Sequence, residues 1–381
     1  MRSAGDTPLT VGVLGAGQLG RMLALAGARL GLQMRFFDPS DTGPCVGLGE
    51  RFVGDWNDEA LVRDFLSGCD VVTLENEWVD LDTVAGLMPE GVPLLPGKQT
   101  LDWISNKLVQ KQHAVDSDLP VGPFRACGSV DEVLAAGEAF SYPIVLKGLE
   151  HGYDGYGTGT AADAEQARAE YERLAQDGVV LVESFVPFVR ELSVIVARRP
   201  DGVDEVYPVL YTRQKDHRCD AVEIPAPCPD AVAARAQELG RKAAAAYDCV
   251  GVVAVEMFEL PSGELYLNEL APRPHNSGHL TIDACVTSQF ENHLRAVLGW
   301  PLGATRLRQP AAVMVNILGT RDGLSNARGV EAALTVPDAS VHLYGKQKVR
   351  PGRKMGHVTV VAEDLETARE HAREAAGKIE L

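Results

Sequence analysis

The sequence lacks the features of a membrane-spanning or exported protein. No apolar run among its 381 residues approaches the roughly 20 residues that a helix needs to cross a bilayer. Its first residues, MRSAGDTPLT, are polar and contain no apolar core like that of a signal peptide. We therefore expect no membrane partner, a loose tail over residues 1–9 and a cytoplasmic location.

The sequence also has no closely spaced pair of cysteines, and its basic residues are fewer than its acidic ones. No two of the seven cysteines have the C-x-x-C spacing of a zinc or redox site, so reduced thiols of a cytosolic protein are expected. The chain has 36 basic against 53 acidic residues and a net charge of −17. This balance argues against a nucleic-acid partner, which would need a basic patch. A small anionic substrate stays compatible with it, because a few Lys and Arg in one cleft can bind a phosphate.

Strand and helix patterns alternate in the first hundred residues. Strands are predicted at 10–17, 33–38 and 70–77, with helices at 18–31 and 59–68 between them. This βαβαβ order predicts a parallel sheet with helices on both faces. Because 381 residues exceed one ordinary core, we expect two or three domains, with the first boundary near 100–106.

The later sequence predicts a mixture of strands and helices. In order these are a strand at 141–148, a glycine-rich stretch at 151–160, a helix at 162–176, strands at 179–186 and 191–199, an Ala-rich helix at 231–248, strands at 251–260 and 264–272, and, after Arg308, strands at 311–319, 339–346 and 357–362. The turn Pro261-Ser262-Gly263 would join its two flanking strands into a hairpin.

A glycine turn links the first strand to the first helix. The motif G-A-G-Q-L-G spans Gly15 to Gly20, and Asp38 ends the next strand about 20 residues further on. Such glycines let backbone N–H groups approach a ligand, and the helix N-terminus favours an anion. Taken alone the motif matches a dinucleotide fingerprint, so NAD binding is one interpretation, and a tight turn without a ligand is another.

Three features of the middle region fit a nucleoside triphosphate site. Lys147 ends an apolar strand, where its ammonium can meet phosphate oxygens. The stretch HGYDGYGTGT that follows can close its N–H groups over phosphates. Glu183 ends another strand, where its carboxylate could accept a hydrogen bond from a ribose hydroxyl. Each residue taken alone is more typical of a solvated charge at a strand end.

A carboxylate pair on the predicted hairpin indicates a metal site. Glu256 and Glu269 lie thirteen residues apart across the turn, so both can face one Mg²⁺, which prefers carboxylate and phosphate oxygens. Apolar neighbours in VVAVEMF surround Glu256, and a carboxylate in such a run usually needs a metal or a cationic partner. Asn268 adds another oxygen at the same edge.

Several longer motifs are similar to those of one known family. The run N-E-L-A-P-R-P-H-N-S-G-H, from Asn268 to His279, closely resembles the signature of N5-carboxyaminoimidazole ribonucleotide synthetases of the ATP-grasp superfamily. Four other runs resemble motifs of the same family. They are GAGQLGRML near the start, TLENE at Thr73 to Glu77, TSQFENHLRAVLGWPLG from Thr287 and the C-terminal LYGKQKVRPGRKMGHVTV. These motifs stand in the family's order and cover nearly all of residues 11–362.

The resemblance implies an α/β protein with an ATP-grasp fold. Its parts would be a Rossmann-like pre-ATP-grasp domain at 1–105, an ATP-grasp domain at 106–307 with a mobile subdomain at about 127–186, and a small C-terminal domain at 308–381. A homodimer is what the family suggests.

The implied reaction joins bicarbonate to the amine of 5-aminoimidazole ribonucleotide in de novo purine biosynthesis, with ATP and Mg²⁺. Bicarbonate is a poor electrophile, so its phosphorylation to carboxyphosphate supplies a leaving group, provided that water is excluded. Mg²⁺ and cationic side chains would neutralise the charge that develops on the transferred phosphoryl group.

The family's motifs imply roles for individual residues of this sequence. ATP would be held by Lys107, Lys147, Gly152, Gly155, Gly157, Glu183, Phe185, Val186, Glu191, Asn268 and Glu269, and Mg²⁺ by Glu256 and Glu269. The ribonucleotide would contact Gly17, Gln18, Leu19 and Glu75, with Lys346 and Arg353 at its phosphate. Arg273 and His275 near bicarbonate, and Tyr153 and Asp154 at the ribonucleotide, are the expected catalytic residues.

Two stretches depart from the family's usual pattern. In the phosphate loop, Glu150 and His151 replace basic or small residues, Tyr156 replaces a cation and Thr158 replaces Gln. Gln214 stands where the family usually has a histidine that contacts ATP. Both departures concern the nucleotide, whereas the motifs for the other substrate are intact.

Other interpretations of the sequence stay open. A divergent ATP-grasp carboxylate–amine ligase acting on another amine would share most of these residues. An NAD-linked oxidoreductase would rest on the first domain alone and leave Glu256 and Glu269 without a use. A non-catalytic nucleotide-binding module would follow if the altered phosphate loop abolished ATP binding.

Overall fold

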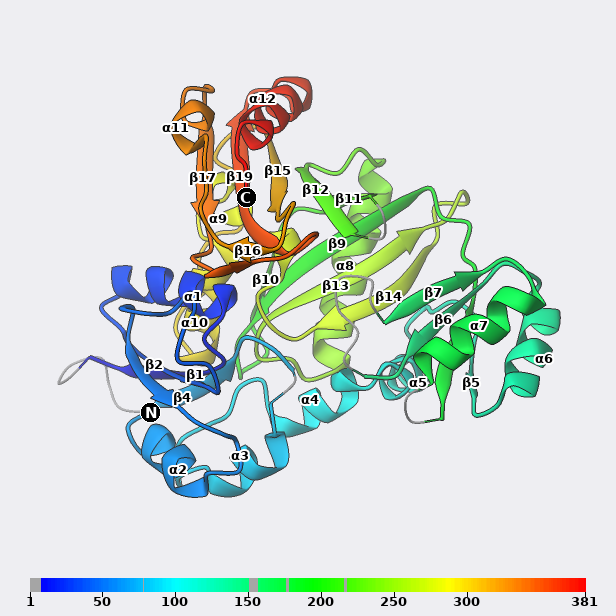
Figure 1. Cartoon of the computed structure of the whole chain (residues 1–381), viewed down its shortest axis with the longest axis horizontal. Coiled ribbons are helices and arrows are strands. Elements are labelled where there is room, and N and C mark those ends of the chain that lie inside the picture. Colours follow the sequence, from blue (N-terminus) through cyan, green and yellow to red (C-terminus); the bar gives the residue numbers. More distant parts are fainter. Residues whose placement is uncertain (1–7, 78, 151–156, 176–177, 216–217) are drawn as a thin grey trace.

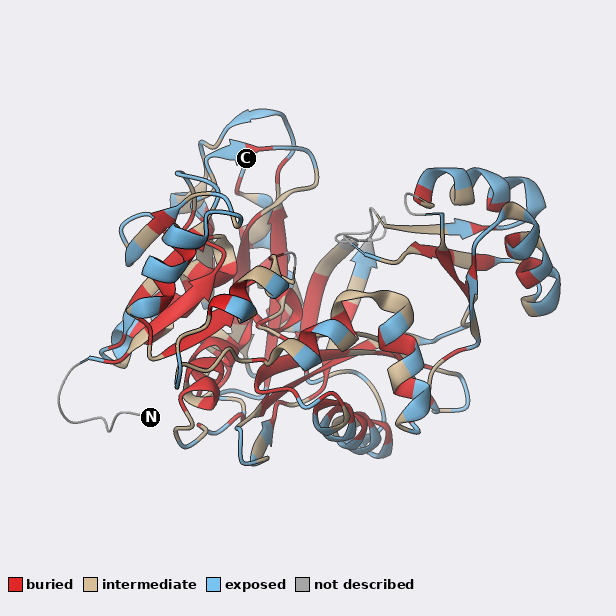
Figure 2. Cartoon of the chain, turned by 90° about the horizontal axis from the view of Figure 1, so that it is seen from below, coloured by how far each residue is buried: buried red, intermediate tan, exposed pale blue. Residues whose placement is uncertain are grey.

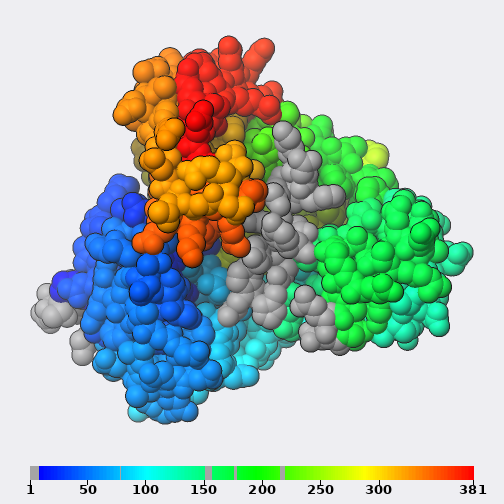
Figure 3. All heavy atoms as spheres, in the orientation of Figure 1, coloured from blue at the N-terminus to red at the C-terminus, as the bar shows by residue number. Residues whose placement is uncertain are grey.

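The computed structural model describes residues 8–77, 79–150, 157–175, 178–215 and 218–381. In the space-filling view of Figure 3 the N-terminal part (blue), the segment around residues 124–184 (green) and the C-terminal part (orange and red) form separate lobes. The expected α/β class is confirmed by the mixture of parallel and antiparallel sheets with helices. Among the described helices, none is long and apolar enough to cross a bilayer.

The N-terminal lobe is a parallel sheet with helices on both faces (Figure 1). Its strand order is β3 (Glu50–Val53), β2 (Gln33–Asp38), β1 (Thr10–Leu14) and β4 (Val71–Leu74). One face is covered by α1 (Gln18–Arg29), and the other by α2 (Glu59–Ser67) and α3 (Leu81–Leu87). The predicted βαβαβ order is confirmed, with β3 as an additional short strand that the sequence pattern did not reveal.

Two consecutive helices lead out of this lobe. These are α4 (Lys98–Ser105) and α5 (Lys107–Asp116), and Asn106 between them has extended backbone. The Asn106 side-chain oxygen accepts hydrogen bonds from the N–H groups of Leu108 and Val109, at 3.1 and 3.2 Å. This N-cap satisfies two backbone donors that a helix start would otherwise leave free, and it fixes where α5 begins.

Residues 124–184 form an antiparallel sheet with two helices. The strand order is β5 (Phe124–Cys127), β8 (Val180–Ser184), β6 (Ile144–Gly148) and β7 (Thr158–Ala161). The helices α6 (Val130–Phe140) and α7 (Ala164–Leu174) share a hydrophobic core with these strands. Figure 2 shows that this lobe projects to one side of the remaining chain.

A long antiparallel sheet connects the centre of the molecule to the C-terminal lobe. Its order is β14 (Leu265–Ala271), β13 (Gly251–Glu259), β9 (Arg190–Arg198), β11 (Leu210–Lys215), β12 (Arg218–Ile224), β15 (Ala311–Leu318), β19 (Lys354–Ala362) and β17 (Ala339–Leu343), with β10 (Asp204–Val206) beside β9. One face of the central strands packs against α8 (Asp230–Ala246). On the other face lie η1 (Asn276–Gly278), α9 (Thr281–Ala284) and α10 (Gln289–Val297), and α10 also packs against α1.

The C-terminal strands belong to this same sheet. Val222 of β12 stands opposite Met314 of β15, so the boundary proposed at residue 307 falls between two strands of one sheet. The lobe also contains α11 (Val330–Ala333), α12 (Leu365–Gly377) and a short pair formed by β16 (Gly323–Leu324) and β18 (Lys348–Val349). As a result, the basic segment between β17 and β19 is held beside the central strands.

Candidate active site

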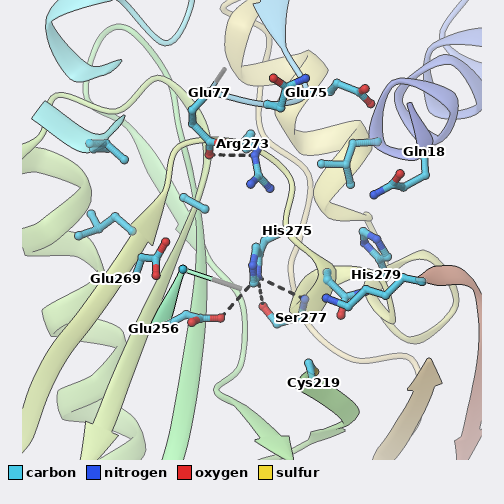
Figure 4. A pocket seen from close by; sticks show the side chains of 18 of the residues that line it. Gln18, Glu75, Glu77, Cys219, Glu256, Glu269, Arg273, His275, Ser277 and His279 are labelled. Atoms are coloured by element: carbon cyan, nitrogen blue, oxygen red, sulfur yellow. Dashed lines mark hydrogen bonds and ion pairs between the residues drawn. The ribbon is translucent and has the colours of Figure 1, made fainter. Parts of the chain in front are cut away.

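A cavity of about 530 Å³ lies where the N-terminal lobe, the central hairpin and the C-terminal segment meet. Figure 4 shows side chains of the N-terminal lobe, such as Gln18, and of the central hairpin, such as Glu256, around one space. The expected site residues that line it are Gln18, Leu19, Glu75, Lys107, Gly157, Glu256, Glu269, Arg273, His275, Lys346 and Arg353. Lys147, Glu183 and Asn268 line a small adjacent cavity that shares Lys107 and Glu269 with the large one.

The carboxylate of Glu75 occupies the amino end of α1. Its two oxygens accept hydrogen bonds from the backbone N–H groups of Gly17 and Gly20, the latter at 2.7 Å. A Cβ atom added at Gly15 or Gly17 would collide with the Glu75 side chain, so this close approach requires glycine. Burial raises the pKa of Glu75, although both N–H groups favour its charged form. The anion position of the glycine turn is therefore filled by the chain's own carboxylate.

We expect NAD and NADP not to bind at Gly15 to Gly20. A pyrophosphate at the start of α1 would meet the Glu75 carboxylate. Asp38, the acidic residue of the fingerprint, already accepts hydrogen bonds from the N–H groups of Ala16 at 2.9 Å and Ser40 at 2.8 Å. Calorimetric titration should give no binding heat for either dinucleotide, and micromolar binding would restore the oxidoreductase interpretation.

Glu256 and Glu269 stand directly opposite each other on β13 and β14, which confirms the predicted hairpin. The register shifts beside this pair, because the next paired residues are Met257 and Leu267. Asn268 is thus the extra residue of a β-bulge, which re-aims side chains locally. Its Oδ1 accepts a hydrogen bond of 3.1 Å from Nζ of Lys147.

Neighbouring cationic side chains compensate the negative charge of Glu269 more fully than that of Glu256. Burial, Glu269 and Glu191 raise the pKa of Glu256 to about 7. Burial also acts to raise the pKa of Glu269, but Lys107, at 2.9 Å, and Lys147 outweigh it and lower that pKa. A further cation beside Glu256 would favour its ionised form at neutral pH. A pair of this kind fits a divalent cation with oxygen ligands, as Mg²⁺ is.

A cluster of lysines surrounds Glu183 beside the hairpin. Lys111 and Lys147 place their Nζ atoms 2.9 and 2.7 Å from its two carboxylate oxygens. Burial opposes the charged form, but Lys147 and Lys111 lower the pKa of Glu183 to about 2, while burial lowers the pKa of Lys111. The structure thus places this carboxylate inside an ion-pair cluster at the end of β8.

Replacing Glu183 with glutamine is expected to destabilise the fold by about 3–5 kcal/mol, because two buried ammonium groups lose their anionic partner. The pKa of Glu183 is depressed in the folded state, so its ion pairs stabilise the fold fully above about pH 4.5 and lose that effect as the pH falls toward 2. Urea denaturation at pH 7 and pH 3 should show that the gap between wild type and variant narrows in acid. The same substitution at the exposed Glu172 is the control, and a gap of equal size at both pH values would contradict the account.

The segment after β14 brings Arg273 and His275 to the cavity. Arg273 forms an ion pair of 2.9 Å between its Nε and an oxygen of Glu77 (Figure 4). Nδ1 of His275 shares a hydrogen bond of 2.9 Å with Oγ of Ser277 and lies 3.8 Å from an oxygen of Glu256. The imidazole is therefore placed beside the carboxylate pair.

Gln289 of α10 fixes the backbone of this loop. Its Oε1 accepts from the N–H of His275 at 3.0 Å, and its Nε2 donates to the carbonyl of the same residue at 2.7 Å. Nε2 of Gln289 also lies 3.1 Å from Nδ1 of His279. Burial lowers the pKa of His279 well below its ordinary value, so this ring is neutral and serves as a packed wall of the cavity.

Basic side chains of the C-terminal segment line the opposite part of the cavity. They are Lys346, Arg350, Arg353 and Lys354. Nζ of Lys346 donates to the carbonyl of Lys354 at 2.8 Å, and Nη1 of Arg353 donates to the carbonyl of Lys348 at 2.7 Å. Gly352 adopts a φ of 76°, the left-handed conformation that the turn between β18 and β19 needs. The predicted approach of Lys346 and Arg353 to one space is thus observed.

Three domain families match the chain in succession. The ribonucleotide synthetase preATP-grasp domain matches residues 9–105, the ATP-grasp domain residues 112–290, and the phosphoribosylaminoimidazole carboxylase C-terminal domain residues 312–371. An N5-carboxyaminoimidazole ribonucleotide synthase of Mycobacterium tuberculosis is 41% identical over 374 residues, which cover 96% of this chain and 86% of that protein. The chain belongs to the N5-carboxyaminoimidazole ribonucleotide synthetase family.

Solved structures of this synthetase family have the same fold. The Aspergillus clavatus enzyme complexed with ATP superposes with a TM-score of 0.89 at 37% identity, covering 97% of this chain and 98% of that one. The enzyme of the same organism in complex with ADP and 5-aminoimidazole ribonucleotide gives a TM-score of 0.88 at 36% identity, with coverage of 97% and 98%. The expected ATP-grasp fold is therefore confirmed, and the chain is an ATP-grasp ligase.

The described residues that depart from the synthetase pattern contact other residues of the site. Nε2 of Gln214 donates to a carboxylate oxygen of Glu191 at 2.8 Å, so the residue at the usual histidine position fixes this acidic side chain. Glu150 accepts a hydrogen bond of 3.1 Å from Asn106, the N-cap of α5. Thr158 starts β7 opposite Lys147 and lines the cavity. Gly152, Tyr153, Asp154 and Gly155, together with His151 and Tyr156, lie outside the described residues.

Some residues of the site were not predicted from the sequence. They are Glu77, Lys111, Gln289, Arg350 and Lys354. Lys111 follows Lys107 by one helical turn on α5, and this spacing could have identified it. Gln289 lies in the run TSQFENHLRAVLGWPLG that resembles the synthetase family, but its contact with the loop depends on how α10 packs against the large sheet.

Proposed function

We propose that this chain joins bicarbonate to the amine of 5-aminoimidazole ribonucleotide, forming N5-carboxyaminoimidazole ribonucleotide in de novo purine biosynthesis while ATP is cleaved to ADP and phosphate. One observation carries this proposal. A single cavity holds a carboxylate pair together with cations from two distant parts of the chain, Lys107 on α5 and Lys346 and Arg353 near the C-terminus. ATP and the ribonucleotide both carry phosphate, so each of them needs its own group of cations in this cavity.

We assign the nucleotide side of the cavity to ATP and Mg²⁺. Lys107 and Lys147 would meet phosphate oxygens, with Gly157, Asn268 and Glu191 close to the same ligand. The nucleotide would also contact Glu183 in β8 and the two residues that follow this strand, Phe185 and Val186. Glu256 and Glu269 would hold Mg²⁺, which supplies positive charge to the transferred phosphoryl group. The raised pKa of Glu256 supports this fit, since the carboxylate lacks enough compensating charge from the protein.

We assign the other side of the cavity to the ribonucleotide. Lys346 and Arg353 provide positive charge for its phosphate, and the guanidinium can bind two phosphate oxygens at once. Gln18 and Leu19 at the start of α1 present the wall against which the imidazole would lie, and Gly17 and Glu75 hold that wall in shape. A rigid wall orients the amine without a conformational cost at each turnover.

We place bicarbonate and its phosphorylated form between these two sides. Arg273 can donate hydrogen bonds to an anion there, because the ion pair of its Nε with Glu77 orients the guanidinium at the cavity wall (Figure 4). His275 stands beside Glu256, held by Gln289 and Ser277, and could accept or donate a proton at a fixed position. Carboxyphosphate hydrolyses readily, so this region must exclude water until the amine attacks.

The experiment that tests this function is an initial-rate assay of ADP release by the purified protein. Mg²⁺ and ATP are kept constant while 5-aminoimidazole ribonucleotide and bicarbonate are each left out in turn. We expect the full rate only when both are present. If the ribonucleotide never stimulates ADP release, the ligase acting on another amine becomes the better account.

We also propose that the protein works in the cytoplasm as a homodimer. Purine biosynthesis supplies nucleotides inside the cell, and the synthetase family suggests the dimer. Light scattering of the purified full chain should give twice the monomer mass of 40.9 kDa. A mass of 40.9 kDa at assay concentration would remove the dimer from this proposal.

A further inference from the structure

A cluster of nitrogen and oxygen ligands lies beside the cavity, among residues that the proposed reaction does not use. It consists of Asp283 on α9, His342 on β17 and His357 on β19. His342 and His357 stand opposite each other across the two strands, and their rings stack with centroids 4.5 Å apart. One ring nitrogen of each histidine and a carboxylate oxygen of Asp283 all lie within 4.8 Å of one another.

The histidine ring at the centre of this cluster has an open ligand position. Nδ1 of His357 shares a hydrogen bond of 3.0 Å with the hydroxyl of Tyr344. Its Nε2 is buried and has no hydrogen-bond partner among the described residues, and the whole side chain is 0% exposed. An unpaired ring nitrogen in a closed interior is costly, so its placement beside two other ligand groups calls for an occupant.

We propose that Asp283, His342 and His357 form a binding site for a transition-metal cation of the Zn²⁺ type. Two imidazoles and one carboxylate are a ligand set that such cations prefer, whereas Mg²⁺ prefers oxygen ligands throughout. Tyr344 acts as an outer partner, since its bond to Nδ1 leaves Nε2 of His357 for the metal. A bound water would complete the tetrahedron.

The present contacts must rearrange to receive the ion, because the His342 and His357 rings stack at an interplanar angle of 17° and a metal lies close to the plane of each imidazole that binds it. Nε2 of His342 now lies 2.8 Å from Oδ2 of Asp283, and neighbouring ligands of a tetrahedral zinc site lie about 3.3 Å apart. The cation would replace the proton that joins these two groups. Asp283 and His342 are 19% and 28% exposed, which gives the ion a route from solvent to the buried His357.

This site is distinct from the carboxylate pair that we assign to Mg²⁺. None of its three ligands lines the cavity, while Tyr344 does so and has the Lys346 ammonium 5.6 Å from the centre of its ring. An ion on His357 would therefore hold Tyr344, and through it the basic side of the cavity, in place. The site also ties α9 to the C-terminal strands.

The test is a Zn²⁺ titration of the full chain after treatment with a chelator and its removal. Saturating Mg²⁺ is present throughout to occupy the carboxylate pair, and a chromogenic chelator reports free Zn²⁺. His342→Gln and Asp283→Asn each remove one partly exposed ligand, with circular dichroism confirming that the variants fold. His371→Gln on α12 is the matched control, because α12 packs against the opposite face of these strands. Co²⁺ in place of Zn²⁺ gives an independent reading through its tetrahedral absorption bands.

We expect the wild type and His371→Gln to bind one equivalent of Zn²⁺, and both ligand variants to bind it at least about tenfold more weakly. The Co²⁺ bands should appear in the first two proteins and be lost in the ligand variants. Failure of the wild type to compete with the chelator, or wild-type affinity in either ligand variant, overturns the assignment. In that case the cluster is a carboxylate–histidine contact that joins α9 to β17.

Discussion

Replacing Glu269 with glutamine is expected to abolish ATP cleavage while leaving the fold intact. Glu269 stands opposite Glu256, and its carboxylate lies 2.9 Å from Nζ of Lys107. Glutamine keeps the shape of the side chain but removes one of the two negative charges offered to Mg²⁺. The lost charge stabilisation should amount to several kcal/mol in the transition state, or a decrease in kcat of at least about 1000-fold.

The control for this variant is the same substitution at Glu264. That residue is exposed just before the same hairpin strand, and its side chain accepts a hydrogen bond of 2.9 Å from the hydroxyl of Ser262. We expect Glu264→Gln to keep wild-type kcat, and Glu269→Gln to keep the wild-type unfolding midpoint, because its side chain is 41% exposed. Near-normal turnover of Glu269→Gln at ordinary Mg²⁺ concentrations would remove Glu269 from the metal site.

Removal of the side chain of either Lys346 or Arg353 is expected to weaken binding of the ribonucleotide and to leave binding of ATP unchanged. Each Ala variant should raise the KM for 5-aminoimidazole ribonucleotide at least about tenfold, since a lost hydrogen bond to a charged group is worth about 1.5–3 kcal/mol. The KM for ATP should barely change, because Lys107 and Lys147 lie on another part of the chain, beside Glu269 and Glu183. Steady-state kinetics with each substrate varied separately measure both constants.

Lys348→Ala provides the matched control for these two variants. Lys348 lies in the same basic segment and is exposed, but its side chain does not line the cavity. We expect its KM for both substrates to stay at the wild-type value. An equal loss of ATP affinity in the Lys346 and Arg353 variants would mean that the two groups of cations do not serve two separate ligands.

The position of the carboxylate pair could be predicted only in part from the sequence. The turn at Pro261 to Gly263 predicted the hairpin, and the hairpin brought Glu256 and Glu269 together. A regular register, continued from the pairing of Met257 with Leu267, would instead have placed Asn268 opposite Glu256. Only the bulge shifts Glu269 into that place, and nothing in the residue spacing reveals a bulge.

Long-range packing accounts for most of what the sequence did not reveal. The capping of α1 by Glu75 depends on β4 lying next to β1, although the two residues joined, Gly17 and Glu75, are 58 positions apart. The same holds for Glu183, whose strand-end position was predicted correctly but whose lysine partners come from α5 and β6. Local patterns predict elements, whereas contacts between elements depend on the complete fold.

The most direct test of the account is the fate of ¹³C-labelled bicarbonate. The purified chain is mixed with ATP, Mg²⁺, 5-aminoimidazole ribonucleotide and labelled bicarbonate, and the products are followed by ¹³C NMR while ADP is measured in parallel. We predict a labelled carbamate carbon on the exocyclic nitrogen of the ribonucleotide, formed at one equivalent per ADP. Release of ADP without any labelled ribonucleotide, or a label on another amine, would contradict the assigned reaction.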